Sequence, residues 1–319
     1  MKKMRKLFIV CIAILFSAGT MFGQDMATAV ETYNAGGKAL GENNYPAAIE
    51  SFEKALAMLE GMSAEEIGDD GKDMIDQAKG IIPQIHLRYA KELINAKEFD
   101  KALAEIDKTV ASGDKYGATD VVADAKDLIP QVLLANGTTL LAASKGAEAI
   151  VELKKVIELD PDNVNAYYLM GAAEAGVNNE AGAIAAFEKA MELGDSRSVK
   201  QLATLYLKKA VEANKAKNTQ EMFNSAVKAD GYEESGNSKM LAGQAAYQLK
   251  KYDDAIKYLE AYVAMSPNAQ NKPDMIYIIA LCYEGKNDGG KACGYFKQLM
   301  NNAKYKEVAT HKVTVQYKC

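Results

Sequence analysis

The chain has 319 residues, of which 49% are hydrophobic, 25% charged and 8% aromatic. This composition excludes a disordered chain, because it holds enough apolar material to bury a core. Six Pro, no Trp and abundant Ala favour helix over an all-β fold, since Ala has the best and Pro the worst helix propensity. The two histidines, His86 and His311, leave little material for a zinc site or a His-dependent catalytic apparatus.

Residues 1–23 have the features of a secretory signal peptide. Lys and Arg dominate the first six residues, an uncharged apolar run covers 7–16, and small residues follow up to Gly23. The apolar run is only half of the roughly 20 residues that a membrane-spanning helix needs. Bulky Val10 before Cys11 argues against a lipid anchor. We expect cleavage near Gly23, and hence an exported protein of the periplasm or cell envelope.

The rest of the chain is acidic. The whole sequence has 38 Lys and Arg against 43 Asp and Glu. Cleavage after residue 23 would remove Lys and Arg residues but no Asp or Glu. Nucleic acid is therefore an unsuitable partner, because phosphate binding depends on clustered cations. No second apolar stretch is long enough to span a bilayer.

One motif recurs at 44–56, 180–191 and 252–260. It has a small residue and a large apolar residue four positions later, and in the first two copies a further small residue three positions after that. This motif resembles the second helix of a tetratricopeptide repeat (TPR), at positions 20, 24 and 27 of its 34-residue unit. The first helix of such a unit precedes the second copy at 167–171, and Pro161 closes the unit before it.

The register of this motif predicts seven repeats. Small residues at positions 8 and 20 let the two helices of a repeat approach closely, while a large residue at 24 fills the gap. A generic helical bundle would not need this pairing of small residues, and the fifth repeat fits it least. In repeat order, position 8 is Gly36, Ala90, Gly137, Gly171, Leu207, Gly243 and Ala280. Position 20 is Ala48, Ala102, Ala149, Ala183, Thr219, Ala255 and Ala292. Position 24 is Phe52, Ile106, Leu153, Phe187, Phe223, Leu259 and Phe296.

The resemblance implies an all-α fold, a right-handed superhelical solenoid of TPR helix-turn-helix repeats, of the type exported by Gram-negative bacteria. We expect the array over 24–303 and a capping tail over 304–319, because the terminal repeat of a solenoid needs a cap. Helical inserts near 61–84 and 112–131 share the text Ala-Lys-x-x-Ile-Pro-Gln. Pro83 and Pro130 in this text would either kink a lengthened helix or begin it. Ser63 and Glu66 form a capping-box pattern ahead of the first copy.

The sequence lacks the common catalytic and cofactor motifs. GxSxG, HExxH, CxxC and GxGxxG are absent. Adjacent acids such as Asp253 and Asp254 are typical of a solvated helix surface, and no segment has the spacing of a calcium loop. We therefore expect no enzyme, no cofactor and no metal site.

The TPR resemblance implies a concave groove lined by the first helix of each repeat, with positions 2, 5, 9 and 12 facing inward. The groove residues that we single out at positions 5 and 12 are Tyr33, Leu87, Leu134, Tyr168, Tyr247 and Tyr277. A C-terminal carboxylate clamp is not expected, because positions 5 and 9 lack its Lys and Asn. The alternative is that some of these residues pack against neighbouring repeats or the tail.

Tyrosines at groove positions would anchor a partner, because they offer large contact area with few rotatable bonds. We expect Tyr168, Tyr247 and Tyr277 to act in this way. Tyr45 and Tyr252, at position 17, should instead contribute to stability.

Two functions are compatible with the sequence. The first is a scaffold that binds a protein or peptide in the groove. The second is a glycan or small-molecule binding protein of the envelope, against which the absence of Trp counts. The sequence indicates no oligomeric state.

Three cysteines follow the signal segment, so in an oxidising compartment one must stay free. Cys282 lies about 200° round its helix from the face that meets the second helix, where Cys293 lies. We therefore expect a Cys293–Cys319 disulfide. A Cys282–Cys293 pair and a fully reduced state are the alternatives.

Overall fold

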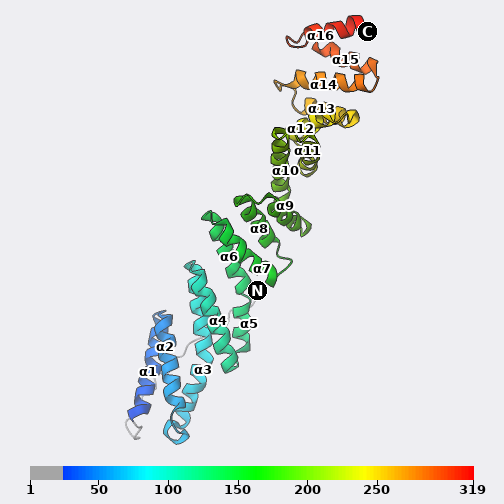
Figure 1. Cartoon of the computed structure of the whole chain (residues 1–319). Coiled ribbons are helices and arrows are strands. Elements are labelled where there is room, and N and C mark those ends of the chain that lie inside the picture. The colour runs from blue at the N-terminus through cyan, green and yellow to red at the C-terminus, as the bar shows by residue number, and fades with distance from the viewer. Residues whose placement is uncertain (1–23) are drawn as a thin grey trace, which may run out of the picture. The chain divides into compact units, whose positions relative to one another are not determined.

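The computed structural model describes residues 24–319, which contain only helices and loops. The expected signal peptide lies outside the described residues. The chain divides into two compact units, one ending at Ala143 and taking in Val151–Asp160, the other formed by Ser144–Ile150 and Pro161–Cys319. Figure 1 shows the helices of each unit following one another in chain order.

The first unit is built from helical pairs and one short helix. Its helices are α1 (Gln24–Gly41), α2 (Tyr45–Glu60), α3 (Ala64–Asn95), α4 (Phe99–Tyr116), α5 (Thr119–Lys126) and α6 (Ile129–Ala142). Helix α7 (Gly146–Leu159) is shared between the two units.

The second unit continues the pairing and ends in two short helices. Its helices are α8 (Val164–Gly176), α9 (Glu180–Glu192), α10 (Arg197–Lys215), α11 (Thr219–Tyr232), α12 (Gly236–Gln248), α13 (Tyr252–Met265), α14 (Lys272–Gly285), α15 (Gly289–Leu299), α16 (Lys306–His311) and the π-helix η1 (Lys312–Tyr317).

Seven turns each contain one residue in the left-handed conformation. In six of these turns the amide after this residue donates to the carbonyl five residues earlier, as from Asn179 to Glu174 and from Asn218 to Ala213, both at 2.9 Å. This bond is the signature of a Schellman turn, which ends one helix and fixes where the next begins. The seven residues, with φ between 56° and 61°, are Asn43, Lys97, Ser144, Asn178, Lys217, Lys250 and Asn287.

The small-to-large packing expected between positions 8 and 24 is confirmed in four repeats. A Cβ added at Gly171 would lie 2.7 Å from the ring of Phe187, and one at Gly243 would lie 2.5 Å from Leu259. Gly36 with Phe52 and Gly137 with Leu153 show the same approach, at 3.1 and 3.0 Å. Each glycine is therefore required because the large side chain of its partner helix occupies the place of a Cβ.

The register predicted for the fifth repeat is wrong by three residues. In the other six repeats the left-handed residue lies five positions before position 20, so Lys217 places position 20 at Met222 rather than Thr219. Positions 8 and 24 become Ala210 and Ala226 instead of Leu207 and Phe223. The corrected residues are at most 1% exposed, whereas Leu207, Thr219 and Phe223 are only half-buried. The large side chain in this repeat stands at position 20 and the small one at 24.

Proline begins the helix in one insert only, and the kink in the other insert lies at Gly68 and not at its proline. Pro83 lies inside α3, whereas Pro130 stands in the first turn of α6. In both copies the following glutamine side chain donates to the carbonyl four residues earlier, Gln84 to Gly80 at 3.2 Å and Gln131 to Asp127 at 2.9 Å. That bond holds the glutamine side chain against the backbone of the preceding turn. The capping box of Ser63 and Glu66 is confirmed at the start of α3.

Candidate interaction surface

Within the first unit, the groove residues predicted at position 5 pack inside the array. The ring of Tyr33 meets Phe52 edge-on at 5.0 Å between centroids, and its hydroxyl donates to Gln77 Oε1 of α3 at 3.0 Å. Leu87 is 7% exposed and belongs to the hydrophobic core, and Leu134 is half-buried. Position 5 in this unit therefore joins a hairpin to its neighbour.

Tyr168 of α8 is half-buried between two other helices of the second unit. Its ring lies 5.7 Å from Phe187 of α9, and the Arg197 guanidinium of α10 covers it at 4.1 Å from the centroid. Arg197 donates to Asp195 at 2.6 Å and to Asn165 at 2.8 Å. These two bonds hold the guanidinium over the ring, where it gains cation–π energy.

Tyr277 of α14 is covered by the C-terminal tail. Its ring lies 6.0 Å from Phe296 of α15 and stacks on Tyr305 at 4.5 Å. Tyr168 and Tyr277 therefore occupy equivalent positions, each against the aromatic residue of its own hairpin and beneath a residue of the next element.

Tyr247 at the end of α12 differs from the other two tyrosines. It is half-buried, and no hydrogen bond or ring pair involves it among residues 24–319. Burial raises the pKa of its hydroxyl, with Cys282 and Tyr252 as the next contributors. Tyr252, one of the position-17 residues, packs its ring against the backbone of α14, because a Cβ at Gly285 would lie 2.5 Å from it.

Two acids on α14 hold the tail, and sequence reasoning did not single them out. Asp274 accepts hydrogen bonds from Lys304 at 2.9 Å and Tyr305 at 2.7 Å, and these bonds lower its pKa. The two acids, Asp274 and Glu284, stand at positions 2 and 12 of the repeat, which would be groove positions if the tail were absent. In the sequence, the signal for the second acid is an acidic residue at position 12 of the last repeat, followed by a tail with several Lys and Tyr.

The second acid is Glu284, at the other end of α14. It accepts hydrogen bonds from Lys312 at 2.6 Å, from Gln316 at 3.2 Å and from the Tyr317 hydroxyl. Burial alone would raise the pKa of Glu284, but the bonds from Lys312 and Tyr317 outweigh it and lower the pKa. Glu284 is therefore a carboxylate at neutral pH and binds the tail as an anion.

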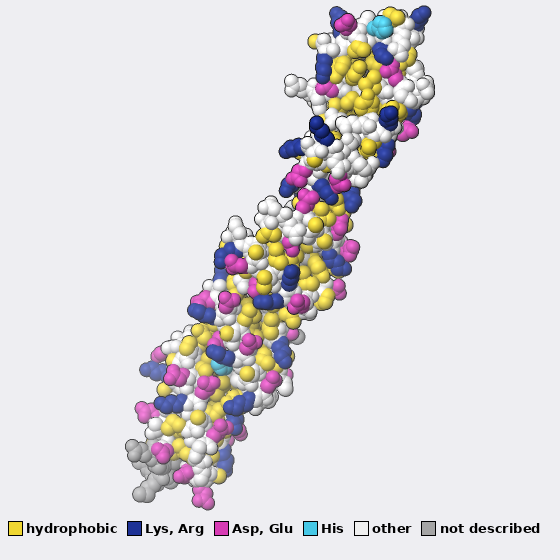
Figure 2. All heavy atoms as spheres, viewed as in Figure 1, with side chains coloured by type: hydrophobic (Ala, Val, Ile, Leu, Met, Phe, Trp, Pro, Cys, Tyr) yellow, Lys and Arg dark blue, Asp and Glu magenta, His cyan; other side chains and the backbone are white. Residues whose placement is uncertain are grey.

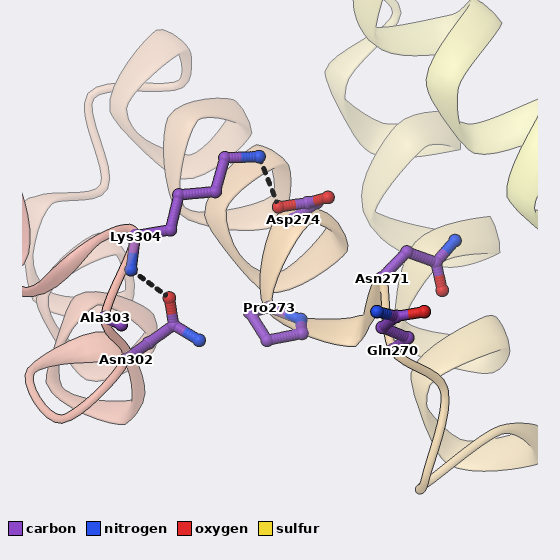
Figure 3. Close-up of a pocket in the computed structure, with 7 residues that line it drawn as sticks. All are labelled: Gln270, Asn271, Pro273, Asp274, Asn302, Ala303 and Lys304. Atoms are coloured by element: carbon purple, nitrogen blue, oxygen red, sulfur yellow. Dashed lines mark hydrogen bonds and ion pairs between the residues drawn. The ribbon is translucent and has the colours of Figure 1, made fainter.

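A polar hollow of about 450 Å³ opens where the tail leaves α15. Figure 3 shows Lys304 reaching across to Asp274, with Asn302 on the tail side and Gln270 and Asn271 on the loop before α14. These five side chains offer hydrogen bonds, and Pro273 and Ala303 complete the lining with apolar groups, so the hollow presents both kinds of contact.

The structure joins Cys293 to Cys319, the pair favoured by the sequence, with 6.7 Å between their Cα atoms. That separation is within the range of protein disulfides. Cys282 is free and buried, and burial raises the pKa of its thiol to about 12. Cys282 is consequently unreactive at neutral pH, because only a thiolate attacks a disulfide.

The surface mixes both signs of charge. Figure 2 shows Lys and Arg side chains interspersed with Asp and Glu over the visible face, and a hydrophobic area among them near the C-terminal end. Within residues 24–319 we find no group of His, Cys, Asp or Glu arranged to hold a metal ion. Over the same residues, no helix has the length and apolarity to cross a membrane.

The hairpin array with small-to-large packing defines a class of helical repeat protein. Two family profiles match it, "TPR repeat" over residues 139–175 and "Tetratricopeptide repeat" over residues 209–270. The chain therefore carries tetratricopeptide repeats, and proteins built from such repeats bind protein partners.

Solved structures with similar folds include several TPR proteins. YrrB, described as a TPR protein with an unusual peptide-binding site, is 18% identical, with 60% of this chain and 95% of YrrB covered and a TM-score of 0.36. MamA is 20% identical over 54% of this chain and 96% of its own, with a TM-score of 0.32. Pseudomonas aeruginosa pilF is 16% identical over 60% and 93%, with a TM-score of 0.28. No curated protein matches the chain.

Proposed function

We propose that the protein is an exported, non-enzymatic scaffold that binds a protein or peptide partner on the first-helix face of its second unit. The observation that carries this proposal is Tyr247, whose half-buried ring packs on one side against the core cluster of the last repeats and whose hydroxyl has no hydrogen-bond partner among residues 24–319. Nearby groove positions on α10 and α12 are Val211, which is 37% exposed, and Gln244, which is half-buried. An apolar floor with a few polar groups suits a peptide.

The test is capture of partners from an envelope extract with wild type and matched tyrosine variants. We expect Tyr247→Ala to weaken capture by about tenfold, as truncation of a hot-spot tyrosine does, at a temperature where the variant is still folded. Tyr252→Ala is the control, because its ring packs on Gly285 and its loss should lower the melting temperature instead. Normal capture by Tyr247→Ala would contradict the proposal.

Tyr168 and Tyr277 serve this surface in a second way. Their rings support Arg197 and Tyr305, so truncation should affect stability as well as capture. A loss of capture by Tyr168→Ala with an unchanged melting temperature would make Tyr168 a direct anchor.

Export rests on the sequence of residues 1–23. We expect the protein in the envelope fraction to begin at Gln24, which N-terminal sequencing measures. A protein that retains Met1 and stays in the cytoplasmic fraction would contradict this part of the proposal.

A second candidate function is glycan binding. The observation that favours it is a hollow of about 430 Å³ in the second unit whose lining includes Tyr232, Tyr258, Asp230 and Lys239. Aromatic faces with carboxylate and ammonium groups are the usual lining of a small polar ligand site. Calorimetric titration with envelope oligosaccharides tests it, with Tyr258→Ala as the variant that should lose binding.

A further inference from the structure

The tail from Asn302 to Cys319 covers the groove positions of the last repeat through two separate attachments. At its start, Lys304 and Tyr305 bind Asp274, and Tyr305 stacks on Tyr277. At its end, Lys312 and Tyr317 bind Glu284. Positions 2, 5 and 12 of the first-helix face in this repeat are therefore all occupied by the chain itself.

The second attachment is partly buried. The side chains of Lys312 and Glu284 are 22% and 18% exposed, and the Tyr317 ring stacks on Phe296 of α15 at 6.3 Å. Ala309 and Val313 are the buried side chains of the tail, while Thr314, Val315, Gln316 and Lys318 are exposed. The disulfide adds a covalent link between the end of the tail and α15.

The two cysteines of this disulfide differ in exposure. Cys319 is exposed, although its Sγ is part-buried 3.9 Å from the Val313 carbonyl, whereas Cys293 is 1% exposed. An incoming thiolate therefore approaches the disulfide from the Cys319 side. Cys282 cannot exchange in its place, since burial keeps it protonated.

We propose that the Cys293–Cys319 disulfide is a redox latch that holds η1 over Glu284, and that a dithiol reductant releases it. One thiolate of the reductant attacks Cys319 Sγ, the bond to Cys293 breaks, and Cys293 leaves and takes a proton. The second thiol of the reductant then displaces Cys319, so the reductant becomes a disulfide and both cysteines become thiols. Release uncovers Glu284 and extends the first-helix face beyond Tyr247, so this regulation rests on the proposed partner surface.

The test is hydrogen exchange of the full-length protein, read by mass spectrometry, before and after treatment with dithiothreitol. We expect amides of residues 312–319 to exchange about tenfold faster after reduction, while α8 to α11 are unchanged. Cys319→Ser should show the fast exchange without reductant. Cys282→Ser is the matched control and should keep the full response to dithiothreitol.

Two results would overturn the latch. Unchanged exchange of residues 312–319 after reduction would make the tail a permanent cap. Joint acceleration of α14, α15 and the tail would mean that reduction unfolds the whole last repeat. The readout needs no partner, so it stands or fails separately from the capture experiment.

Discussion

The fourth and fifth repeats share a turn but place their large residue differently. In the fourth repeat the turn at Asn178 leads to Ala183 at position 20 and Phe187 at position 24, with Gly171 opposite. In the fifth, the turn at Lys217 leads to Met222 at position 20 and Ala226 at position 24. The comparison teaches that the turn sets the register, while the large side chain can move by one helical turn.

The same comparison explains why the second helices of both repeats bury their inward residues equally well. Ala183, Phe187, Met222 and Ala226 are each at most 2% exposed. A close-packed interior requires a filled volume and not a particular residue at each site. The two repeats should therefore respond differently to the same kind of substitution.

The largest effect should come from adding volume in the fourth repeat. Gly171→Val should lower the free energy of unfolding by about 3 kcal/mol, because its Cβ would meet the buried Phe187 ring. Urea denaturation measures the loss. Gly176→Ala is the control, since nothing lies within 4 Å of its Cβ position, and it should melt at or above wild type. Equal stability of Gly171→Val and wild type would refute the packing.

A slightly smaller loss should come from removing volume in the fifth repeat. Met222→Ala should cost about 2–3 kcal/mol, because it leaves a cavity at a site that is 1% exposed. Thr219→Ala, at the position that the sequence register assigned to the core, should cost only about 0.5 kcal/mol. The same denaturation experiment ranks the two variants, and a reversed order would restore the original register.

A substitution at the junction between the fourth and fifth repeats should cost less stability. Asp195 is 7% exposed and accepts from the Ser198 amide at 2.9 Å and from Arg197 at 2.6 Å. Burial pushes its pKa upward, but the bonds from Ser198 and Arg197 outweigh burial and lower the pKa. Asp195→Asn should cost about 1–2 kcal/mol at pH 7.

The pH dependence of that cost follows from its sign. A lowered pKa in the folded state stabilises the protein above the unfolded pKa of about 3.9, and this stabilisation fades as pH falls through the folded value. Wild type and Asp195→Asn should therefore converge below about pH 4. A difference in unfolding free energy that is the same at pH 7 and pH 3 would count against the ionic role.

The smallest effect should be a gain in stability, and it should differ between the turn at Lys217 and the turn at Asn178. Lys217→Gly should stabilise the protein by about 0.5–1 kcal/mol, because lysine is strained at φ 57° and glycine is not. Asn178→Gly should change stability by only a few tenths of a kcal/mol, since asparagine tolerates this conformation. Thermal melts of both variants test this, and equal shifts would show that side-chain strain plays no part.

The sequence predicted the helical hairpins well where chemistry marks both partners. Gly171 and Phe187 are recognisable because close helix packing needs one very small and one large residue. The fifth repeat was misplaced because its small and large residues are exchanged, with Met222 at position 20 and Ala226 at position 24. The large Phe223 then fitted position 24 of the wrong register, although Leu207 did not fit the small position 8.

The prediction of the partner-binding surface was less accurate for a different reason. Position 5 is visible in the repeat pattern, but the residues that cover it come from the next element. Nothing in the spacing of Tyr168 indicates Arg197 above it, and Tyr305 lies in a tail that has no repeat pattern. Tyr247 also packs against the core cluster of the last repeats, but no hydrogen bond or ring pair involves it among residues 24–319.

The disulfide also decides how the molecule carries mechanical load. A pull on the C-terminal residue passes from Cys319 through the sulfur bridge to Cys293 and so enters α15 directly. The residues from 294 to 318 lie in a closed loop off that path and bear no tension. A force applied through the C-terminal residue would therefore act on the last hairpin first, and η1 would bear none of it.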